Sequence, residues 1–310
     1  MKVLEAPALP STLRLGAAHL VVSDLDRSLA WYERALGLRT HRHERREAGL
    51  GVGGEDVLVL HEQPDAQPAG RHAGLYHVAL LHASREELAR AAARLSVTRT
   101  PIIGASDHGT HEAIYLPDPD GNEIELAADR PREAWPDLSA GYGGGPQPLD
   151  FDDLVGTIVG EEPTVRAGAG LVVGHLHLHV GDVDEGVRFY RDVLGFEVQT
   201  VMPTAAFVSA GGYHHHLAFN VWRGVGVPPA PENAVGLRHW TIVLDDPAGV
   251  AARVRAAGFA VEERADGYLV RDPWNIALLL SSSQSLSSPA AAAVETGSRT
   301  TSTSGGSTAR

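Results

Sequence analysis

Apolar and polar positions alternate in a pattern that recurs along most of the chain. After Leu15 a short run with a strand-like period of two passes into the amphipathic stretch DLDRSLAWYERALGL, which starts at an Asp and stops at a Gly. Short strand-like runs broken by Gly, Pro and Asp follow, for example over residues 56–60. The pattern predicts one strand, one helix and then three strands, which together form a βαβββ module.

This module occurs four times. The first copy returns from Val173, and the alignment of the two copies places His19 on His177. A second strand, loop and helix pattern begins at Leu75 and returns from Leu237. The four modules span residues 13–66, 72–131, 170–224 and 234–281.

The repeat predicts an α+β fold in which four βαβββ modules pair into two open barrel-like domains. Modules 1 and 2 are expected to form the domain 10–131, and modules 3 and 4 the domain 169–281. Residues 132–168 are rich in Gly, Pro and Asp and are predicted to be the linker. Residues 282–310 have too few large apolar side chains to offset the entropy of ordering them, so a disordered tail is predicted.

Composition narrows the chemistry that the chain could perform. Cysteine is absent from the 310 residues, whereas histidine occurs 16 times. The chain therefore has no disulfide framework, no thiolate metal site and no cysteine nucleophile. Any metal must be bound by imidazole, carboxylate or water, which makes histidine the residue type to follow.

The charge balance and the apolar runs exclude two kinds of partner. With 39 acidic and 26 basic residues, a net charge of −13 and no long basic run, the chain is not expected to bind nucleic acid. The apolar runs stay under about ten residues, far short of the roughly 20 that span a bilayer, and the N-terminal sequence lacks the core of a signal peptide. A soluble cytoplasmic protein without a membrane partner is expected.

Two histidines and one glutamate have the residue types and places of a metal site. His19 lies on the first strand of module 1, His77 at the matching place in module 2, and Glu125 on the last strand of module 2. Because equivalent strands of paired modules face each other, these side chains are expected on one concave face. Two imidazoles and a carboxylate leave open positions on a divalent ion such as iron(II). A lone His is more often a hydrogen-bonded core residue, but two at equivalent positions beside a Glu favour the metal site.

The βαβββ repeat, the helix DLDRSLAWYERALGL and the strand YLPDPDGNEIEL resemble the vicinal-oxygen-chelate superfamily. Within it, they resemble the type I extradiol dioxygenases of the catechol 2,3-dioxygenase kind, over roughly residues 10–280. The family signature falls on His108, Ile114-Tyr115, Asp118-Pro119, Gly121 and the ligand Glu125. Ser106 departs from this signature, which prefers Gly, Asn, Thr, Ile or Val two residues before the His.

The resemblance implies a metal-dependent ring-cleaving dioxygenase whose cofactor is iron(II), or manganese(II) in its place. Its substrates would be a catechol-type aromatic diol and O2, and homo-oligomers are common in the superfamily. His61, on the last strand of module 1, would accept and return a phenolic proton. His108 and Tyr115 would orient the substrate and stabilise charge on its oxygen.

Other assignments of the same residues remain open. If Glu62 rather than His61 pointed inward, the site would hold two His and two Glu, as in metal isomerases such as glyoxalase I. The parity of the strand over residues 57–62 does not decide between the two. A non-catalytic small-molecule binding protein of the same superfamily, such as a resistance protein, would need neither metal nor turnover.

The second half of the chain repeats the histidines but not the glutamate. His177 and His239 repeat the two expected ligands, whereas Leu278 stands where the glutamate would recur and Leu269 where the tyrosine would. The cluster His214–His216 could add a third imidazole, from His216 or His214, so an all-histidine site is an alternative to a degenerate cavity. Some relatives pair modules across the two halves, which keeps His177 and His239 in consideration for a shared site. The histidines expected at the surface or rim are His41, His43, His72, His82 and His111.

Overall fold

A computed structural model describes residues 6–137 and 145–286 of the chain. All four modules have the predicted order of one strand, one helix and three strands, so the α+β prediction is confirmed. None of the helices in these residues combines the length and the apolar character needed to cross a membrane.

The elements of the four modules have the following bounds. Module 1 contains β2 (Ala18–Val22), α1 (Leu25–Trp31), its π-helical continuation η1 (Tyr32–Leu36), β3 (Arg39–Glu44), β4 (Glu47–Gly51) and β5 (Asp56–Glu62). Module 2 contains β6 (Gly74–His82), α2 (Arg85–Val97), β7 (Gly104–Asp107), β8 (His111–Pro117) and β9 (Glu123–Asp129). Module 3 contains β11 (Val172–His179), α4 (Val183–Val187), the π-helix η5 (Arg188–Leu194), β12 (Glu197–Met202), β13 (Ala205–Ser209) and β14 (Leu217–Asn220). Module 4 contains β15 (Gly236–Val243), α5 (Pro247–Ala256), β16 (Val261–Arg264), β17 (Gly267–Arg271) and β18 (Ala277–Ser281).

The start of each module's helix is set by a short polar side chain. The N-cap residues are Asp24, Ser84, Asp182 and Asp246, and each accepts a hydrogen bond from the backbone N–H three residues further on. This bond satisfies one of the N–H groups that the first helical turn leaves without a partner. The cap therefore fixes how far the helix begins from the preceding strand.

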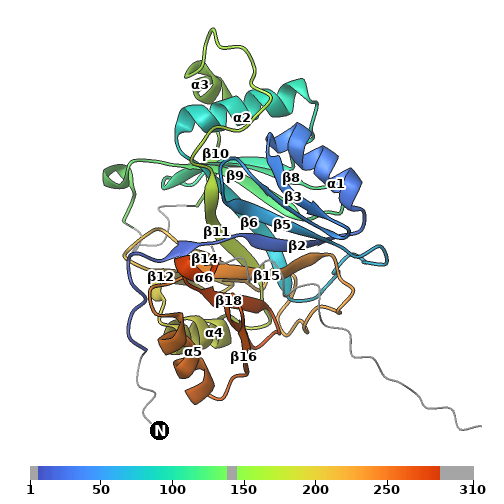
Figure 1. The fold of residues 1–310 in the computed structure, drawn as a ribbon. Coiled ribbons are helices and arrows are strands. Elements are labelled where there is room, and N and C mark those ends of the chain that lie inside the picture. Colours follow the sequence, from blue (N-terminus) through green and yellow to red (C-terminus); the bar gives the residue numbers. More distant parts are fainter. Residues whose placement is uncertain (1–5, 138–144, 287–310) are drawn as a thin grey trace, which may run out of the picture.

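The modules pair differently from the sequence-based expectation. Strand β2 of module 1 pairs antiparallel with β15 of module 4, and β6 of module 2 pairs antiparallel with β11 of module 3 (Figure 1). The expected pairing of module 1 with 2 and of module 3 with 4 is therefore not the one that the strands adopt. The first strands of all four modules have the same alternation of apolar and polar residues. The sequence pattern therefore predicts that first strands pair with each other, but not which module pairs with which.

Two open sheets result from this pairing. The first runs in the order β16-β17-β18-β15-β2-β5-β4-β3, with β1 (Arg14–Leu15) beside β15. The second runs in the order β10-β7-β8-β9-β6-β11-β14-β13-β12, where β10 is Gln147–Pro148. Within the described residues the end strands of each sheet are not joined to each other, so neither sheet closes into a barrel.

The segment expected to link two domains packs on module 2 where it is described. Strand β10 extends the second sheet next to β7, and the short helix α3 (Phe151–Gly156) lies beside α2 (Figure 1). Arg90 of α2 forms an ion pair with Glu161 at 2.7 Å. Residues 283–286, at the start of the expected tail, form the short helix α6, and the tail from residue 287 lies outside the described residues.

Two equivalent hydrogen bonds connect neighbouring modules through the interior. The hydroxyl of Tyr32 in module 1 donates to Asp118 Oδ2 in module 2 at 3.0 Å. The hydroxyl of Tyr190 in module 3 donates to Asp272 Oδ2 in module 4 at 2.9 Å. Because modules 1 and 2 belong to different sheets, as do modules 3 and 4, each bond joins the two sheets through buried polar groups.

We expect the Asp272 carboxyl to make the stability of the fold depend on pH. Burial raises its pKa from 3.8 to about 7, against hydrogen bonds from the Ile276 backbone and Tyr190 that lower it. The native state then binds more protons than the unfolded state between about pH 4 and 7, so this group lowers the free energy of unfolding as pH rises through that window. The free energy of unfolding of the wild type should fall relative to that of Asp272→Asn by as much as about 4 kcal/mol.

Urea unfolding at a series of pH values from 4 to 8 measures this difference. Asp184→Asn, at an exposed position on α4, is the matched control. A gap between wild type and Asp272→Asn that stays constant over the whole range would contradict the prediction.

Candidate metal centre

Three buried side chains converge on the concave face of the second sheet. The Nε2 atom of His77 lies 3.0 Å from Glu125 Oε2, and the Nε2 atom of His175 lies 3.1 Å from the same oxygen. One donor atom from each residue lies within 4.8 Å of the other two, so these three side chains could hold a metal ion as they stand. His77 comes from β6, Glu125 from β9 and His175 from β11.

Strand register brings these side chains together. The parallel pairing of β6 with β9 sets Glu125 beside Ala79, and the antiparallel pairing of β6 with β11 sets His175 on the other side of Ala79. His77 is two residues before Ala79, so it points to the same face of the sheet. The small Ala79 side chain leaves room for the longer ligands to meet above it.

The structure assembles part of the predicted set and adds His175 in place of His19. The sequence does contain a signal for His175, namely its distance along the chain from the helix N-cap. His77 precedes Ser84 by seven residues, and His175 precedes Asp182 by the same number. His19 precedes its cap by only five, so the alignment that matched it to His77 was two residues out of register.

His19 and His61 lie on the first sheet, away from this group. His19 Nδ1 is 2.9 Å from His61 Nε2, and the His19 ring stacks on that of His239. Burial, with smaller effects of His239 and His61, lowers the pKa of His19, and burial also lowers the pKa of His61. The cause of the separation is the module pairing, since module 1 joins module 4 rather than module 2. Glu62 faces the helix, where it accepts a hydrogen bond from the Leu25 backbone N–H at 3.2 Å.

His108 and Tyr115 lie where the sequence signature predicts, next to the group. His108 Nε2 and the Tyr115 hydroxyl are 2.8 Å apart, and Tyr115 is paired with Glu125 across β8 and β9. Burial raises the pKa of Tyr115 well above its usual value, and the negative charge of Glu125 adds to this effect. Burial lowers the pKa of His108 to about 4. The phenol and the imidazole are therefore both neutral at ordinary pH.

Two histidines expected at the surface are buried instead. His111 Nε2 lies 3.2 Å from Glu125 Oε1, so His111 contacts the carboxylate from the side opposite the two candidate ligands. His82, at the end of β6, is also buried. The sequence carries no periodic signal for their burial, because His82 ends β6 and His111 begins β8, where the alternation of each strand stops.

Of the cluster 214–216 in module 3, His215 lines the same cavity. His214 Nε2 lies 3.0 Å from Asp129 Oδ1, and His214 Nδ1 lies 2.9 Å from His215 Nδ1. The His215 ring is 4.1 Å from that of His175, measured between centroids. His216 turns back to the chain, where its Nδ1 accepts from the backbone N–H of residue 210.

His177 points toward the same space but is already engaged. Its Nε2 lies 2.8 Å from Asn220 Nδ2, which is a donor only. That nitrogen therefore accepts, and the ring carries its proton on Nδ1. Because its Nε2 is engaged by Asn220, His177 is not one of the candidate ligands, whose donor atoms point at one another.

The cavity in front of the group has a volume of about 440 Å³. Its polar walls include His77, His108, His111, Tyr115, Glu125, His175, His177 and His215. Its apolar and aromatic walls include Tyr76, Met202, Phe207 and Trp222. A cavity of this volume holds a small aromatic molecule, with the converging polar groups on one side.

Burial and charge act against each other at the carboxylate. Burial alone would raise the pKa of Glu125, but His175 and His77 outweigh it and hold this pKa well below its usual value. Burial also opposes protonation of His77, yet Glu125 and Glu123 raise the pKa of His77 to about 9. The carboxylate is thus ionised and needs a cation beside it. One buried oxygen, Oε1, has no well-aligned hydrogen-bond donor.

The corresponding position in module 4 is apolar. Parallel pairing of β15 with β18 and antiparallel pairing of β17 with β18 place Leu279 opposite Leu269, as Glu125 lies opposite Tyr115. The residue at the glutamate position is therefore Leu279 and not Leu278, one residue earlier. An apolar side chain cannot ligate a metal at either place.

Comparison with known proteins agrees with this architecture. A family model described as the Glyoxalase/Bleomycin resistance protein/Dioxygenase superfamily matches residues 14–126 and 172–278. The chain belongs to this superfamily. It is 41% identical over 268 residues to a catechol-2,3-dioxygenase of Bacillus subtilis, covering 84% of this chain and 93% of that protein.

Solved structures of the superfamily share the fold. A putative dioxygenase from Bacillus subtilis aligns with a TM-score of 0.60 at 13% identity, covering 89% of this chain and 86% of that one. Glyoxalase I from Zea mays aligns with a TM-score of 0.57 at 17% identity, covering 89% of this chain and 94% of that one. At these identities the likeness supports the fold alone.

The donor set fits a divalent metal of the superfamily. Two imidazole nitrogens and one carboxylate oxygen suit iron, manganese and similar ions and leave further positions open. Glu123 Oε1 lies 3.8 Å from His77 Nδ1, on the side of the ring away from Glu125. At this distance the carboxylate attracts a protonated His77 ring but makes no hydrogen bond to Nδ1.

We expect metal affinity to depend on His175 much more than on His177. His175→Ala should weaken binding of Co²⁺ by more than about 100-fold, because it removes one of three converging donors, whereas His177→Ala should change it far less. Titration of Co²⁺ into the metal-free protein, followed by visible absorption, measures both constants. Equal losses in the two variants would contradict this assignment of ligands.

Proposed function

We propose that the protein is an extradiol ring-cleaving dioxygenase that acts on a catechol-type aromatic diol with O2 and iron(II). The observation that carries the proposal is the group of two histidines and one glutamate at the end of an aromatic-lined cavity. The 41% identity to a catechol-2,3-dioxygenase supports it. Manganese(II) uses the same donor set and is the alternative metal.

His77, His175 and Glu125 would hold the metal. When bound, the ion supplies a common centre on which adjacent hydroxyl oxygens and O2 meet and exchange electrons. Three protein ligands leave positions for both substrates. The protein side chains hold the substrate ring in a fixed position and move protons to and from the substrate oxygens.

Aromatic side chains position the substrate ring. Phe207, Trp222 and Tyr76 line the cavity, and Tyr76 contacts both the His77 ring and the Trp222 ring. Flat apolar walls favour an aromatic ring over an extended chain and exclude water from the reacting bond. The Tyr115 hydroxyl and His108 stand at the polar end, where they can donate to a substrate oxygen that gains charge.

His215 is the proposed acid/base in place of His61. An ionised Asp129 can only accept, so His214 donates from Nε2 and its Nδ1 is left to accept. His215 then donates from Nδ1 to His214, so Nε2 is the accepting nitrogen of the His215 ring in this tautomer. Burial lowers the pKa of His215 well below its usual value, so the ring is neutral at ordinary pH. In this role it would accept a phenolic proton only while the substrate is bound, and return it later.

The isomerase alternative requires a second carboxylate ligand. Glu62, the residue considered for that role, faces the helix of module 1 on the other sheet. The dioxygenase is therefore favoured over a glyoxalase-like isomerase.

Loss of the carboxylate should abolish activity. After anaerobic loading with iron(II), we expect O2 uptake and a new product absorbance with catechol or a substituted catechol. Glu125→Ala should remove both, while His43→Ala on the exposed strand β3 should retain them. Full activity without Glu125, or no O2 uptake by wild type with iron confirmed bound across a panel of catechols, would contradict the proposal.

Replacing the proton-handling residues should reduce kcat and leave KM little changed. His215→Gln should lower kcat by about 10²- to 10⁴-fold, the usual contribution of a general base. Asp129→Asn should lower it by a smaller factor, because an amide oxygen still accepts from His214 but no longer carries the charge that favours this tautomer. Steady-state kinetics with matched iron content tests both variants. A His215→Gln enzyme with wild-type kcat would remove His215 from the mechanism.

A further inference from the structure

A second cluster of histidines lies on the concave face of the first sheet. His19 comes from β2, His61 from β5 and His239 from β15. His61 and His239 are buried and His19 is half-buried. The ring of His19 lies between the other two, with centroids 5.1 Å from His61 and 3.8 Å from His239.

Strand register sets all three on one face. The antiparallel pairing of β15 with β2 places His239 opposite His19. The parallel pairing of β2 with β5 places His61 beside Val21, two residues after His19 and on the same side. The three histidines therefore come from three adjacent strands, two in the first module and one in the last.

Hydrogen bonding orients His61 as metal-binding histidines are oriented. Its Nδ1 lies 3.3 Å from Glu47 Oε2, and its Nε2 lies 2.9 Å from His19 Nδ1. A carboxylate on one ring nitrogen fixes the tautomer and directs the lone pair of the other nitrogen outward. In the absence of an ion, His19 Nδ1 donates to that lone pair. An ion would replace the shared proton, and His19 would carry its proton on Nε2 instead.

The spacing of these two nitrogens suits ligands of one ion. Two donors at about 2.0–2.1 Å from a tetrahedral Zn²⁺ stand roughly 3.3 Å apart, so a small outward shift from 2.9 Å accommodates it. The His239 ring stacks on that of His19, with 3.8 Å between the centroids and 26° between the ring planes. In the proposed site two donors are in place, and a rotation about the side-chain bonds of His239 on binding would supply the third.

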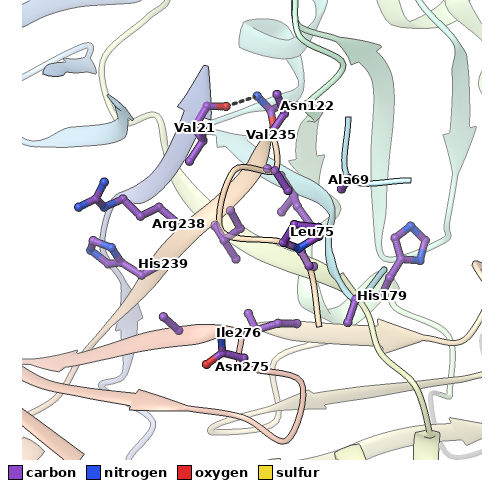
Figure 2. A pocket seen from close by; sticks show the side chains of 18 of the residues that line it. Val21, Ala69, Leu75, Asn122, His179, Val235, Arg238, His239, Asn275 and Ile276 are labelled. Atoms are coloured by element: carbon purple, nitrogen blue, oxygen red, sulfur yellow. Dashed lines mark hydrogen bonds between the residues drawn. The ribbon is translucent and has the colours of Figure 1, made fainter. Parts of the chain in front are cut away.

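One member of the cluster, His239, connects it to a separate cavity. His239 lines a space of about 680 Å³ between the sheets, at whose wall Figure 2 shows His239 and Arg238 side by side. Arg238 is exposed, so water screens its repulsion of a cation. Its charge also favours an anion, such as hydroxide or a carboxylate, at the remaining position of the ion.

We propose that His19, His61 and His239 form a second divalent-metal site, of the all-imidazole type that favours Zn²⁺, Co²⁺ or Ni²⁺ over hard cations. The site has no carboxylate ligand, since Glu47 acts on the far nitrogen of His61. An ion there joins strands of module 1 and module 4 and stabilises the folded chain. The proposal does not depend on the activity of the first site.

Zn²⁺ stoichiometry in a factorial set of variants tests the proposal. Equilibrium dialysis with metal analysis should give two equivalents for wild type, one for the Glu125→Ala/His77→Ala double variant and one for His61→Ala. The combination of all three changes should give none. His43→Ala, an exposed histidine on β3, is the matched control and should keep two.

The equivalent retained by the double variant and by His61→Ala shows that each of these two proteins is folded. A single equivalent in wild type that His61→Ala leaves unchanged, or a second equivalent that persists in both His61→Ala and His19→Ala, would overturn the proposal. If His61→Ala fails to fold, Glu47→Gln provides a second readout and should weaken Zn²⁺ binding to the double variant by about 10-fold. Co²⁺ bound to the double variant should show tetrahedral absorption bands, and bands of octahedral intensity would indicate an adventitious ion only.

Discussion

The antiparallel register between β6 and β11 is the constraint on which the candidate centre depends. It sets His175 beside Ala79, while the parallel register of β9 sets Glu125 on the other side. A slip of one residue would turn His175 to the helix-covered face. The register contains a bulge at Gly174, where a Cβ atom would lie 2.7 Å from the Cβ of Leu81. A glycine is required there, because any side chain would push the two central strands apart and separate the donors.

The first sheet repeats this pairing with different side chains, and the contrast shows where the chemistry resides. Leu269, Ala277 and Leu279 form a small buried apolar cluster on its concave face. By register, Leu269 and Leu279 occupy the places of Tyr115 and Glu125. Both sheets have the same backbone plan, so the plan alone does not create a metal centre. The fold supplies equivalent positions, and the side chains at those positions decide which of them can ligate.

The parts that could be predicted from sequence are those that depend on local pattern. Strand alternation and N-caps act over a few residues, so the modules and their order were predictable, as were His77 and Glu125 within one module. The choice of partner module depends on contacts between distant copies with the same alternation, and it could not be read. His175 was within reach, because its spacing to Asp182 equals that of His77 to its own cap. The role of His215 could not be read, since it depends on a hydrogen-bonded chain through residues from two modules.

Electrostatics gives an independent reason to place a cation at this centre. An ionised carboxylate that is nearly inaccessible to water is costly unless a positive charge stands beside it. His77 and His175 both direct Nε2 at the same oxygen of Glu125. When no ion is bound, one proton on His77, whose pKa is raised to about 9, balances the single charge of the carboxylate. A divalent ion would displace that proton and accept lone pairs from all three donors at once. The same buried charge that holds a proton on His77 therefore favours a cation at this centre.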